Sequence, residues 1–165
     1  MNEIELENRL KSLETVQYAI WFHDIIYNPK SHDNEELSLE EFKKFQLESQ
    51  SVQLNQISDD IQLMIISTKN HIKTSHDISM DLNYFLDMDL SILGTSTEQY
   101  QTYSESIRKE YIHIDIDKYR QGRSSILKGF IQHGINGLYR TPEFRDTYGQ
   151  KSLENLQSEI NKLTT

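Results

Sequence analysis

The sequence contains no cysteine, so no disulfide stabilises the fold and nothing in it requires an oxidising compartment. Its start, MNEIELENRL, lacks the basic and apolar regions of a secretory signal peptide, and we therefore expect a cytoplasmic protein. Only 6 glycines and 2 prolines occur in 165 residues, which disfavours the turn-rich sequence of an all-β protein. Leu, Ile, Glu, Gln and Lys are common instead, and they favour long helices and an all-α fold.

Long apolar runs and basic clusters are also missing. The longest apolar stretch covers residues 18–22 and resumes at 25–27, which is far too short to span a bilayer, so we expect it to be buried in protein. The formal net charge is -9, and no segment is basic enough to suggest the surface that a nucleic-acid backbone requires. We therefore expect neither a membrane nor a nucleic-acid polymer as partner, whereas a small anionic substrate is compatible with the composition.

Helical periodicity fills most of the sequence, and the gaps carry start and stop signals. Asn28-Pro29 ends one predicted helix, and Gly94 with Ser96 separates two others. The predicted helices span residues 2–14, 15–27, 34–50, 58–73, 81–93, 97–111, 115–133 and 149–163. No repeat, low-complexity tract or long linker divides the chain, and its 36% hydrophobic residues can bury one core. We expect a single helical-bundle domain over residues 1–165.

One predicted helix, 15–27, is apolar on every side apart from a single His-Asp pair. His23 falls in the middle of one apolar face, while Trp21 and Ile25 make the other sides apolar too. We therefore expect this helix to be central in the fold, with His23 and Asp24 pointing inward. A buried charged group must be paired, neutralised or bound to a metal ion.

Two other predicted helices carry a charged residue in the apolar stripe. In 81–93 the stripe is completed at helical spacing by Asp89, whereas Asp87 points well away from it. In 115–133 Arg123 lies among the apolar residues, and a buried guanidinium requires a carboxylate or a phosphate. Such residues can form a polar cavity inside a helical bundle, which is the usual setting of a carboxylate-histidine metal site.

Glu35 and His71 are weaker candidates, since each lies beside the inner face of its predicted helix. Structural explanations also stay open. A core histidine such as His23 is more often hydrogen-bonded than metal-bound, and Asp89 with Arg123 can form a buried salt bridge. A second His-Asp dipeptide occurs in a predicted loop, so the dipeptide alone is weak evidence for a metal site.

Several separated sequence blocks occur in an order typical of one protein family. The blocks are AIWFHDIIYNP with DNEELS at 19–38, FLDMDLSILG at 85–94 and YRQGRSSIL at 119–127, with shorter matches STKNH at 67–71 and IRKEYIHI at 107–114. Over roughly residues 15–131 the chain resembles a bacterial family of predicted metal-dependent phosphohydrolases of the HD-domain superfamily. The resemblance implies an all-α HD fold.

The resemblance also implies a metal site. His23 and Asp24 would be the middle ligands and Asp89, the second acid of DMD, the last ligand, while Asp87 would at most support the site. A set of histidine and carboxylate ligands with open positions suits Mn, Fe, Co, Ni or Mg better than a structural zinc. Such an ion polarises a phosphoryl oxygen and activates a water molecule, here for hydrolysis of a small phosphate ester such as a nucleotide.

Further residues receive roles from the same resemblance. Lys69 and Arg123 would hold the phosphate group of the substrate. His71 would protonate the leaving oxygen or steady the attacking water, and Glu35 would orient a ligand or a water molecule. Asp24 would serve in catalysis as well as in metal binding.

The family's first histidine has no counterpart in this sequence. HD domains take their first metal ligand from an earlier helix, yet residues 1–22 contain no histidine. In relatives a short His-rich segment lies before the point where this sequence begins, so we expect the chain to be short at its N-terminus relative to the family. His32, His76 or His113 would replace that ligand only if the fold brought one of them close.

Three functions therefore stay open. The first is a metal-dependent phosphohydrolase, and the second, suggested by the missing histidine, is a non-catalytic HD-like protein that binds a nucleotide or a partner subunit. The third is a helical interaction protein whose inward polar residues only pair with one another. A homodimer also stays open, because Tyr100, Tyr103 and Tyr111 suit a dimer face, although we expect them in the core.

Overall fold

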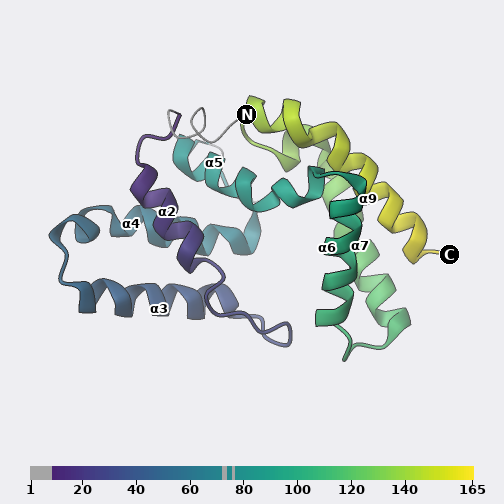
Figure 1. Ribbon diagram of the computed structural model, residues 1–165, viewed down its shortest axis with the longest axis horizontal. Helices are drawn as coiled ribbons and strands as arrows, with labels where there is room; N and C mark the ends of the chain where they lie inside the picture. The colour runs from purple at the N-terminus through teal and green to yellow at the C-terminus, as the bar shows by residue number, and fades with distance from the viewer. Residues whose placement is uncertain (1–8, 72–73, 76) are drawn as a thin grey trace. The chain divides into compact units, whose positions relative to one another are not determined.

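A computed structural model describes residues 9–71, 74–75 and 77–165 of the protein (Figure 1). Throughout this part of the chain the regular secondary structure is helical, which confirms the prediction of an all-α fold. None of its helices is long and apolar enough to cross a membrane. The first predicted helix, 2–14, falls mostly outside the described residues.

Each of the other predicted helices has a counterpart in the structure. The long helices are α2 (Leu13–Phe22), α3 (Asn34–Ser49), α4 (Val52–Ser67), α5 (Met80–Asp89), α6 (Thr97–Glu110), α7 (Ile116–Leu138) and α9 (Gln150–Leu163). Shorter helical segments are η1 (Thr68–Asn70), η2 (Leu90–Gly94), α8 (Pro142–Phe144) and η3 (Arg145–Gly149). The main differences from the prediction are that α2 ends at Phe22 and that α4 already begins at Val52.

Side-chain caps explain where two of these helices begin. Ser51 accepts a hydrogen bond from the backbone N–H of Leu54 at 3.2 Å, so α4 starts well before residue 58, where the prediction placed its beginning. Ser96 and Gln99 form a capping box at the start of α6, at the position that the sequence predicted. The capping residues therefore indicate where these two helices begin more accurately than hydrophobic periodicity does.

The chain divides into two compact units, unit 1 (Met1–Leu86) and unit 2 (Asp87–Thr165). The division falls within α5, and the units are described one at a time. The single domain expected from the sequence stays a prediction.

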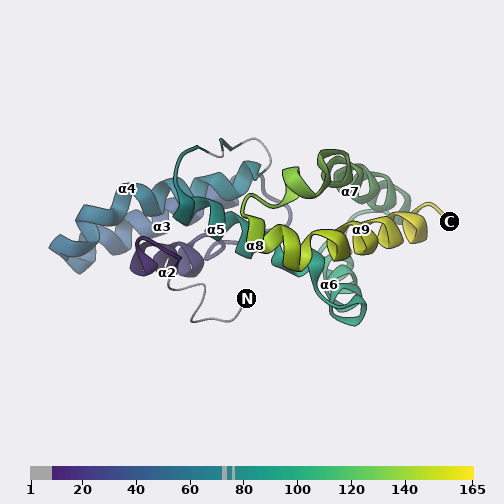
Figure 2. The same cartoon turned by 90° about the horizontal axis from the view of Figure 1, so that it is seen from above.

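In unit 1, α3 and α4 lie side by side and α2 packs against both of them (Figures 1 and 2). Gln50 joins α3 to α4 in the left-handed conformation, with φ of 51°. The buried core consists of Phe42, Leu54, Ile61 and Ile65, and the rings of α2 cover its edge. Phe22, for example, meets Phe42 edge to face with ring centroids 5.3 Å apart.

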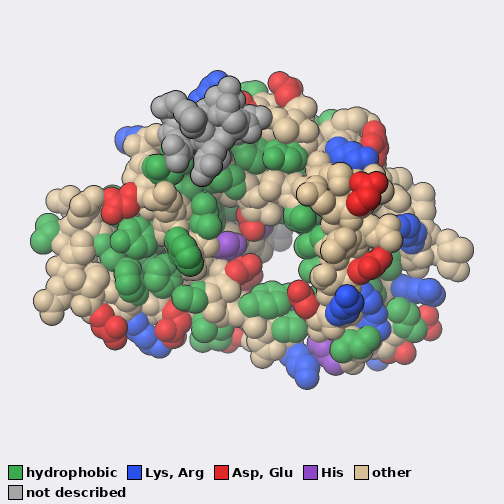
Figure 3. Space-filling model, in the orientation of Figure 1, with side chains coloured by type: hydrophobic (Ala, Val, Ile, Leu, Met, Phe, Trp, Pro, Cys, Tyr) green, Lys and Arg blue, Asp and Glu red, His purple; other side chains and the backbone are tan. Residues whose placement is uncertain are grey.

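The expectation that the apolar stretch around His23 is buried is wrong for four residues. Trp21 is 78% exposed, and Ile20, Ile25 and Tyr27 are about half exposed. Figure 3 likewise shows hydrophobic side chains at the surface of unit 1. The physical reason is that α2 contacts its neighbours along one face, where Val16 and Ala19 are buried, so its other sides stay open whatever residues they carry.

In unit 2, α7 packs along α9, and α9 also contacts η2, η3 and α6. Apolar and aromatic side chains form the interior of this unit, among them Tyr100, Tyr119, Leu127, Leu156 and Ile160. Tyr100 is therefore a core residue, as expected. Gly94 allows a close approach of backbones, because a Cβ atom there would lie 2.5 Å from the Cβ of Tyr148.

Candidate functional site

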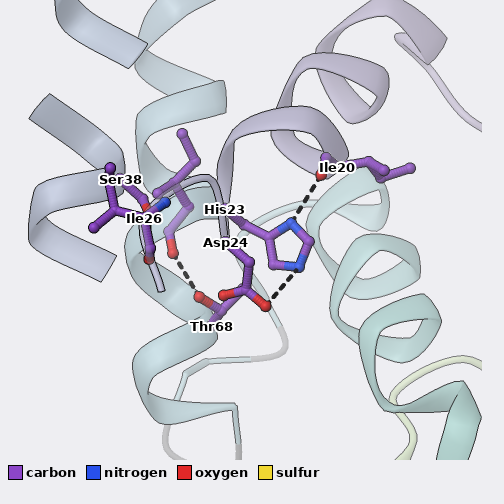
Figure 4. Close-up of polar contacts among 7 residues, drawn as sticks. Ile20, His23, Asp24, Ile26, Ser38 and Thr68 are labelled. Atoms are coloured by element: carbon purple, nitrogen blue, oxygen red, sulfur yellow. Dashed lines mark hydrogen bonds and ion pairs between the residues drawn. The ribbon is translucent and has the colours of Figure 1, made fainter. Parts of the chain in front are cut away.

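His23 lies at the C-terminal end of α2, where its ring has a fixed orientation (Figure 4). Ring atom Nδ1 is 3.0 Å from the carbonyl oxygen of Ile20, and because a carbonyl only accepts, Nδ1 carries the proton of this bond. Atom Nε2 faces Asp24, with 3.6 Å between Nε2 and Oδ2. Phe85 supports the ring from one side in an edge-to-face contact, with centroids 5.7 Å apart.

The His23 and Asp24 side chains lie close enough together for one metal ion to contact both. A metal-binding histidine usually donates its second ring N–H to a carbonyl or carboxylate, as His23 does to Ile20. Bonds from a divalent ion to imidazole nitrogen and carboxylate oxygen measure about 2.0–2.2 Å, so one ion can reach two atoms that lie 3.6 Å apart. The Asp24 side chain is 60% exposed and open to solvent, so the expectation that it points inward is wrong.

The DNEELS block fixes the loop that follows Asp24. Ser38 is fully buried, and its hydroxyl accepts from the N–H of Ile26 at 3.1 Å and donates to the carbonyl of the same residue at 3.2 Å. Asn34 pairs in the same way with both backbone groups of Asn28. Ile26 thus bonds to α3 instead of continuing the helix, which explains why α2 ends before the predicted position.

Lys69 and Glu36 form an ion pair in unit 1. The Lys69 ammonium also donates to the carbonyl oxygen of His32 at 3.0 Å, so it fastens the loop before α3 to η1. The hydrogen bond between the two side chains lowers the pKa of Glu36 and raises the pKa of Lys69. Lys69, which the resemblance assigns to phosphate binding, is therefore paired with a carboxylate of the same unit.

The two weaker candidates also lie in unit 1. Glu35 is in the first turn of α3 and partly buried. His71 follows η1 and is partly buried as well, but it is not part of α4, because the α-helix ends at Ser67. The prediction that this α-helix continues through His71 is therefore wrong, while the catalytic roles of both residues stay predictions.

The two acids of the DMD motif differ in burial. Asp87 is fully buried, and its Oδ1 accepts from the N–H of Arg140 at 2.7 Å while its Oδ2 accepts from the N–H and the hydroxyl of Thr141. Burial raises the pKa of Asp87, although these hydrogen bonds oppose the rise. Asp89 is the last residue of α5 and partly exposed. With both oxygens bonded, Asp87 holds the segment at Arg140 and is unsuited to bind a metal.

The expected orientation of Asp87 was wrong. The sequence analysis assigned one buried stripe to this helix and placed Asp87 away from it. In the structure Asp81, Asn83 and Tyr84 are buried along with the stripe, so α5 is enclosed on all sides up to Asp87. A single amphipathic stripe does not describe a helix that is surrounded by protein.

Arg123 is held by a carboxylate within unit 2. Its Nε donates to Oε1 of Glu159 at 2.9 Å and its Nη2 to Oε2 at 3.3 Å, and both side chains are nearly inaccessible to solvent. The Tyr100 hydroxyl donates to the same carboxylate. Burial acts to raise the pKa of Glu159, but the hydrogen bonds from Arg123 and Tyr100 together lower it. The buried guanidinium predicted from the sequence thus has its carboxylate.

Glu159 was missed in the sequence analysis. It lies on the buried face of α9 with Asn155, Leu156 and Ile160, so the signal was an acid at helical spacing among apolar residues. Asp89 and Arg123 were selected in the same way, as charged residues in the apolar stripe of a predicted helix.

The remaining histidines named as substitutes for the first ligand differ in their surroundings. His32 is exposed, and His113 stacks on Tyr111 with ring centroids 6.1 Å apart. His76 lies outside the described residues. Among the residues that the structure describes, no group of three or more His, Asp and Glu side chains is arranged to hold a metal ion.

No family model, no curated protein and no solved structure matches this chain. The resemblance to HD-domain phosphohydrolases therefore depends on the sequence blocks alone.

Proposed function

We propose that the chain is a metal-dependent phosphohydrolase of the HD type that acts on a small phosphate ester. The observation that carries this proposal is the geometry of the His-Asp pair. His23 has its Nδ1 bonded to a carbonyl and its Nε2 turned toward the Asp24 carboxylate, which are the features expected of adjacent metal ligands.

In this proposal His23 and Asp24 bind a divalent ion. The ion would polarise a phosphoryl oxygen and lower the pKa of a water molecule bound to it. Phe85 keeps the His23 ring in place, and the carbonyl of Ile20 keeps the ring proton on Nδ1. Asp24, open to solvent, leaves the substrate access to the site.

Of the two cations proposed to bind phosphate, Lys69 is the better candidate. Breaking the buried pair of Arg123 with Glu159 would cost about 3–5 kcal/mol, because it leaves an uncompensated buried charge. The pair of Lys69 with Glu36 is partly exposed, and exposed ion pairs stabilise a fold only weakly. A phosphate group can therefore compete for Lys69 more readily than for Arg123.

A non-catalytic HD-like protein that binds a nucleotide or a partner subunit is the second candidate. The observation that favours it is the pairing of both cations, Lys69 and Arg123, with carboxylates of the same chain. Such pairing satisfies the charges without a substrate. The two candidates differ in turnover, since only the first predicts hydrolysis.

Metal content and hydrolysis of a generic phosphate monoester test the first candidate. After incubation with Mn²⁺ and desalting, we expect about one ion per chain, lost in His23→Ala and Asp24→Asn, together with hydrolysis that both variants abolish. His113→Ala is the matched control, because His113 stacks on Tyr111 in unit 2 and should change neither result. Hydrolysis that persists in His23→Ala would overturn the proposal, and bound metal without hydrolysis would favour the second candidate.

A further inference from the structure

We propose that unit 2 carries a binding groove for a phosphate group between α7 and the end of α9. The groove encloses about 340 Å³ and is lined by Arg120, Ser124, Lys128 and Thr164, with Gln121 and Ser125 beside them. Nothing in this proposal requires a metal ion or the His23-Asp24 pair, so it stands apart from the proposed hydrolysis.

The helical repeat of α7 brings the groove residues together. Arg120, Ser124 and Lys128 follow one another at intervals of four residues, so they lie on one side of the helix in successive turns. The other arginine of the YRQGRSSIL block, Arg123, is bound to Glu159 in the interior. Of the two arginines in the block, Arg120 is therefore the one that can meet a ligand.

The two cations have no partner in the described part of the chain. Neither Arg120 nor Lys128 forms an ion pair or hydrogen bond there, and both are exposed. Two unpaired cations one turn on either side of a serine create a positive potential that favours an anion in the groove.

Ser124 supplies an independent indication of a ligand. The residue is only 5% exposed, and its hydroxyl has no hydrogen-bond partner in the structure. Leaving a buried hydroxyl unpaired is unfavourable, so such a group points to an acceptor that is still to be bound. Ser124 is among the residues that line the groove, and in this proposal a phosphate oxygen bound between Arg120 and Lys128 is the acceptor for its hydroxyl.

The end of α9 does not oppose an anion as strongly as a bare helix C-terminus would. Carbonyl groups at a helix C-terminus carry partial negative charge and normally repel anions. Here the hydroxyl of Thr164 donates to the carbonyl of Ile160 at 2.9 Å, and the hydroxyl of Thr165 donates to that of Asn161 at 2.8 Å. These bonds satisfy part of the exposed carbonyl charge.

The size of the groove indicates a small ligand. Its volume lies at the lower end of the range for small-molecule sites, about 300–1,000 Å³. A nucleic-acid polymer would meet the repulsion of a chain with net charge -9. A phosphate monoester or inorganic phosphate fits both the volume and the charge of the groove.

Titration of the full chain with inorganic phosphate, followed by amide NMR shifts at ionic strength held constant with chloride, tests the groove. We expect saturable shifts centred on residues 120–128 and 163–164. Arg120→Gln with Lys128→Gln should weaken binding roughly tenfold or more, because charge-assisted hydrogen bonds are lost. Ser124→Ala should weaken it roughly two- to tenfold without destabilising the fold, since its hydroxyl has no partner to lose.

Lys43→Gln with Lys118→Gln is the matched control, since it removes two exposed positive charges outside the groove and should leave binding unchanged. Shifts that do not saturate, or an equal loss of binding in the control and the groove variant, would overturn the proposal, because either result indicates general attraction of anions.

Discussion

Two buried carboxylates of unit 2 show how the partners of a carboxylate decide the direction in which its pKa shifts. Asp87 accepts hydrogen bonds from two backbone N–H groups and a hydroxyl, and burial raises its pKa although these bonds and the charge of Arg140 oppose the rise. Glu159 is also buried, but Arg123 supplies a full positive charge, and the pKa of Glu159 falls instead. The guanidinium bonded directly to Glu159 outweighs the effect of burial, whereas the hydrogen bonds and the charge near Asp87 do not.

The Glu159 carboxylate should therefore stabilise the fold in a pH-dependent way. Because its pKa in the folded protein lies below the ordinary value of 4.5, its contribution is fully present above that value and is lost as the pH falls through the lowered pKa. Glu159→Gln should lower the free energy of unfolding by about 3–5 kcal/mol at pH 7, since Arg123 is left buried and unpaired.

Urea unfolding of the wild type and Glu159→Gln at pH 7 and at pH 3 measures this contribution. The difference between the two proteins should shrink at the lower pH. An equal difference at both pH values would show that the glutamate acts by packing and not by its charge.

At the scale of elements, the start of α2 is joined to α5 by hydrogen bonds from backbone N–H groups to a carboxylate. The buried Asp81 carboxylate, in the first turn of α5, accepts from the N–H groups of Lys11 and Ser12 at 2.7 and 2.8 Å, just before α2 begins. A carboxylate at a helix N-terminus satisfies unpaired N–H groups and interacts favourably with the helix dipole. His23 is at the other end of the same helix.

Asp81→Ala should therefore loosen the start of α2. We expect the free energy of unfolding to fall by about 1–3 kcal/mol, because two partly buried N–H groups lose their acceptor. Amide hydrogen exchange in the first turn of α2 should accelerate. Asp117→Ala, which removes an exposed acid from the first turn of α7, should have a much smaller effect, and equal effects of the two substitutions would contradict the assigned role of Asp81.

At the scale of the whole molecule, the net charge of -9 attracts divalent cations in general. A specific metal site must therefore be distinguished from this diffuse attraction. His23→Ala makes the distinction, since it removes one proposed ligand without adding or removing a carboxylate.

Mn²⁺ at about one hundred times its dissociation constant should raise the free energy of unfolding by about 2.7 kcal/mol. For a protein of this size the rise corresponds to roughly 5–11 °C in Tm, measured by thermal unfolding. The shift should vanish in His23→Ala and persist in His113→Ala. A shift of the same size in all three proteins would indicate diffuse binding of Mn²⁺ and would count against a site at His23.

The helices and much of their extent could be predicted from the sequence alone. Helix formation depends on contacts between residues three and four apart, so periodicity, caps and breakers near each position carry the information. The all-α fold, the boundaries of α3 and α6, and the inward position of Arg123 follow from such local patterns. The His-Asp pair was also found in this way, as a polar interruption of an apolar segment.

Only the tertiary structure decided which polar groups meet. Arg123 with Glu159, Lys69 with Glu36 and Asp87 with Thr141 are pairs far apart in the sequence, and each cation could have met any of 26 acidic residues. Burial of α5 on all sides and exposure of Trp21 likewise depend on which faces the neighbouring helices cover. Hydrophobic periodicity reveals the preferred face of a helix, but the packing of the chain determines what lies against that face. Packing contacts join segments that are far apart in the sequence, and a local sequence pattern does not specify which segments will meet.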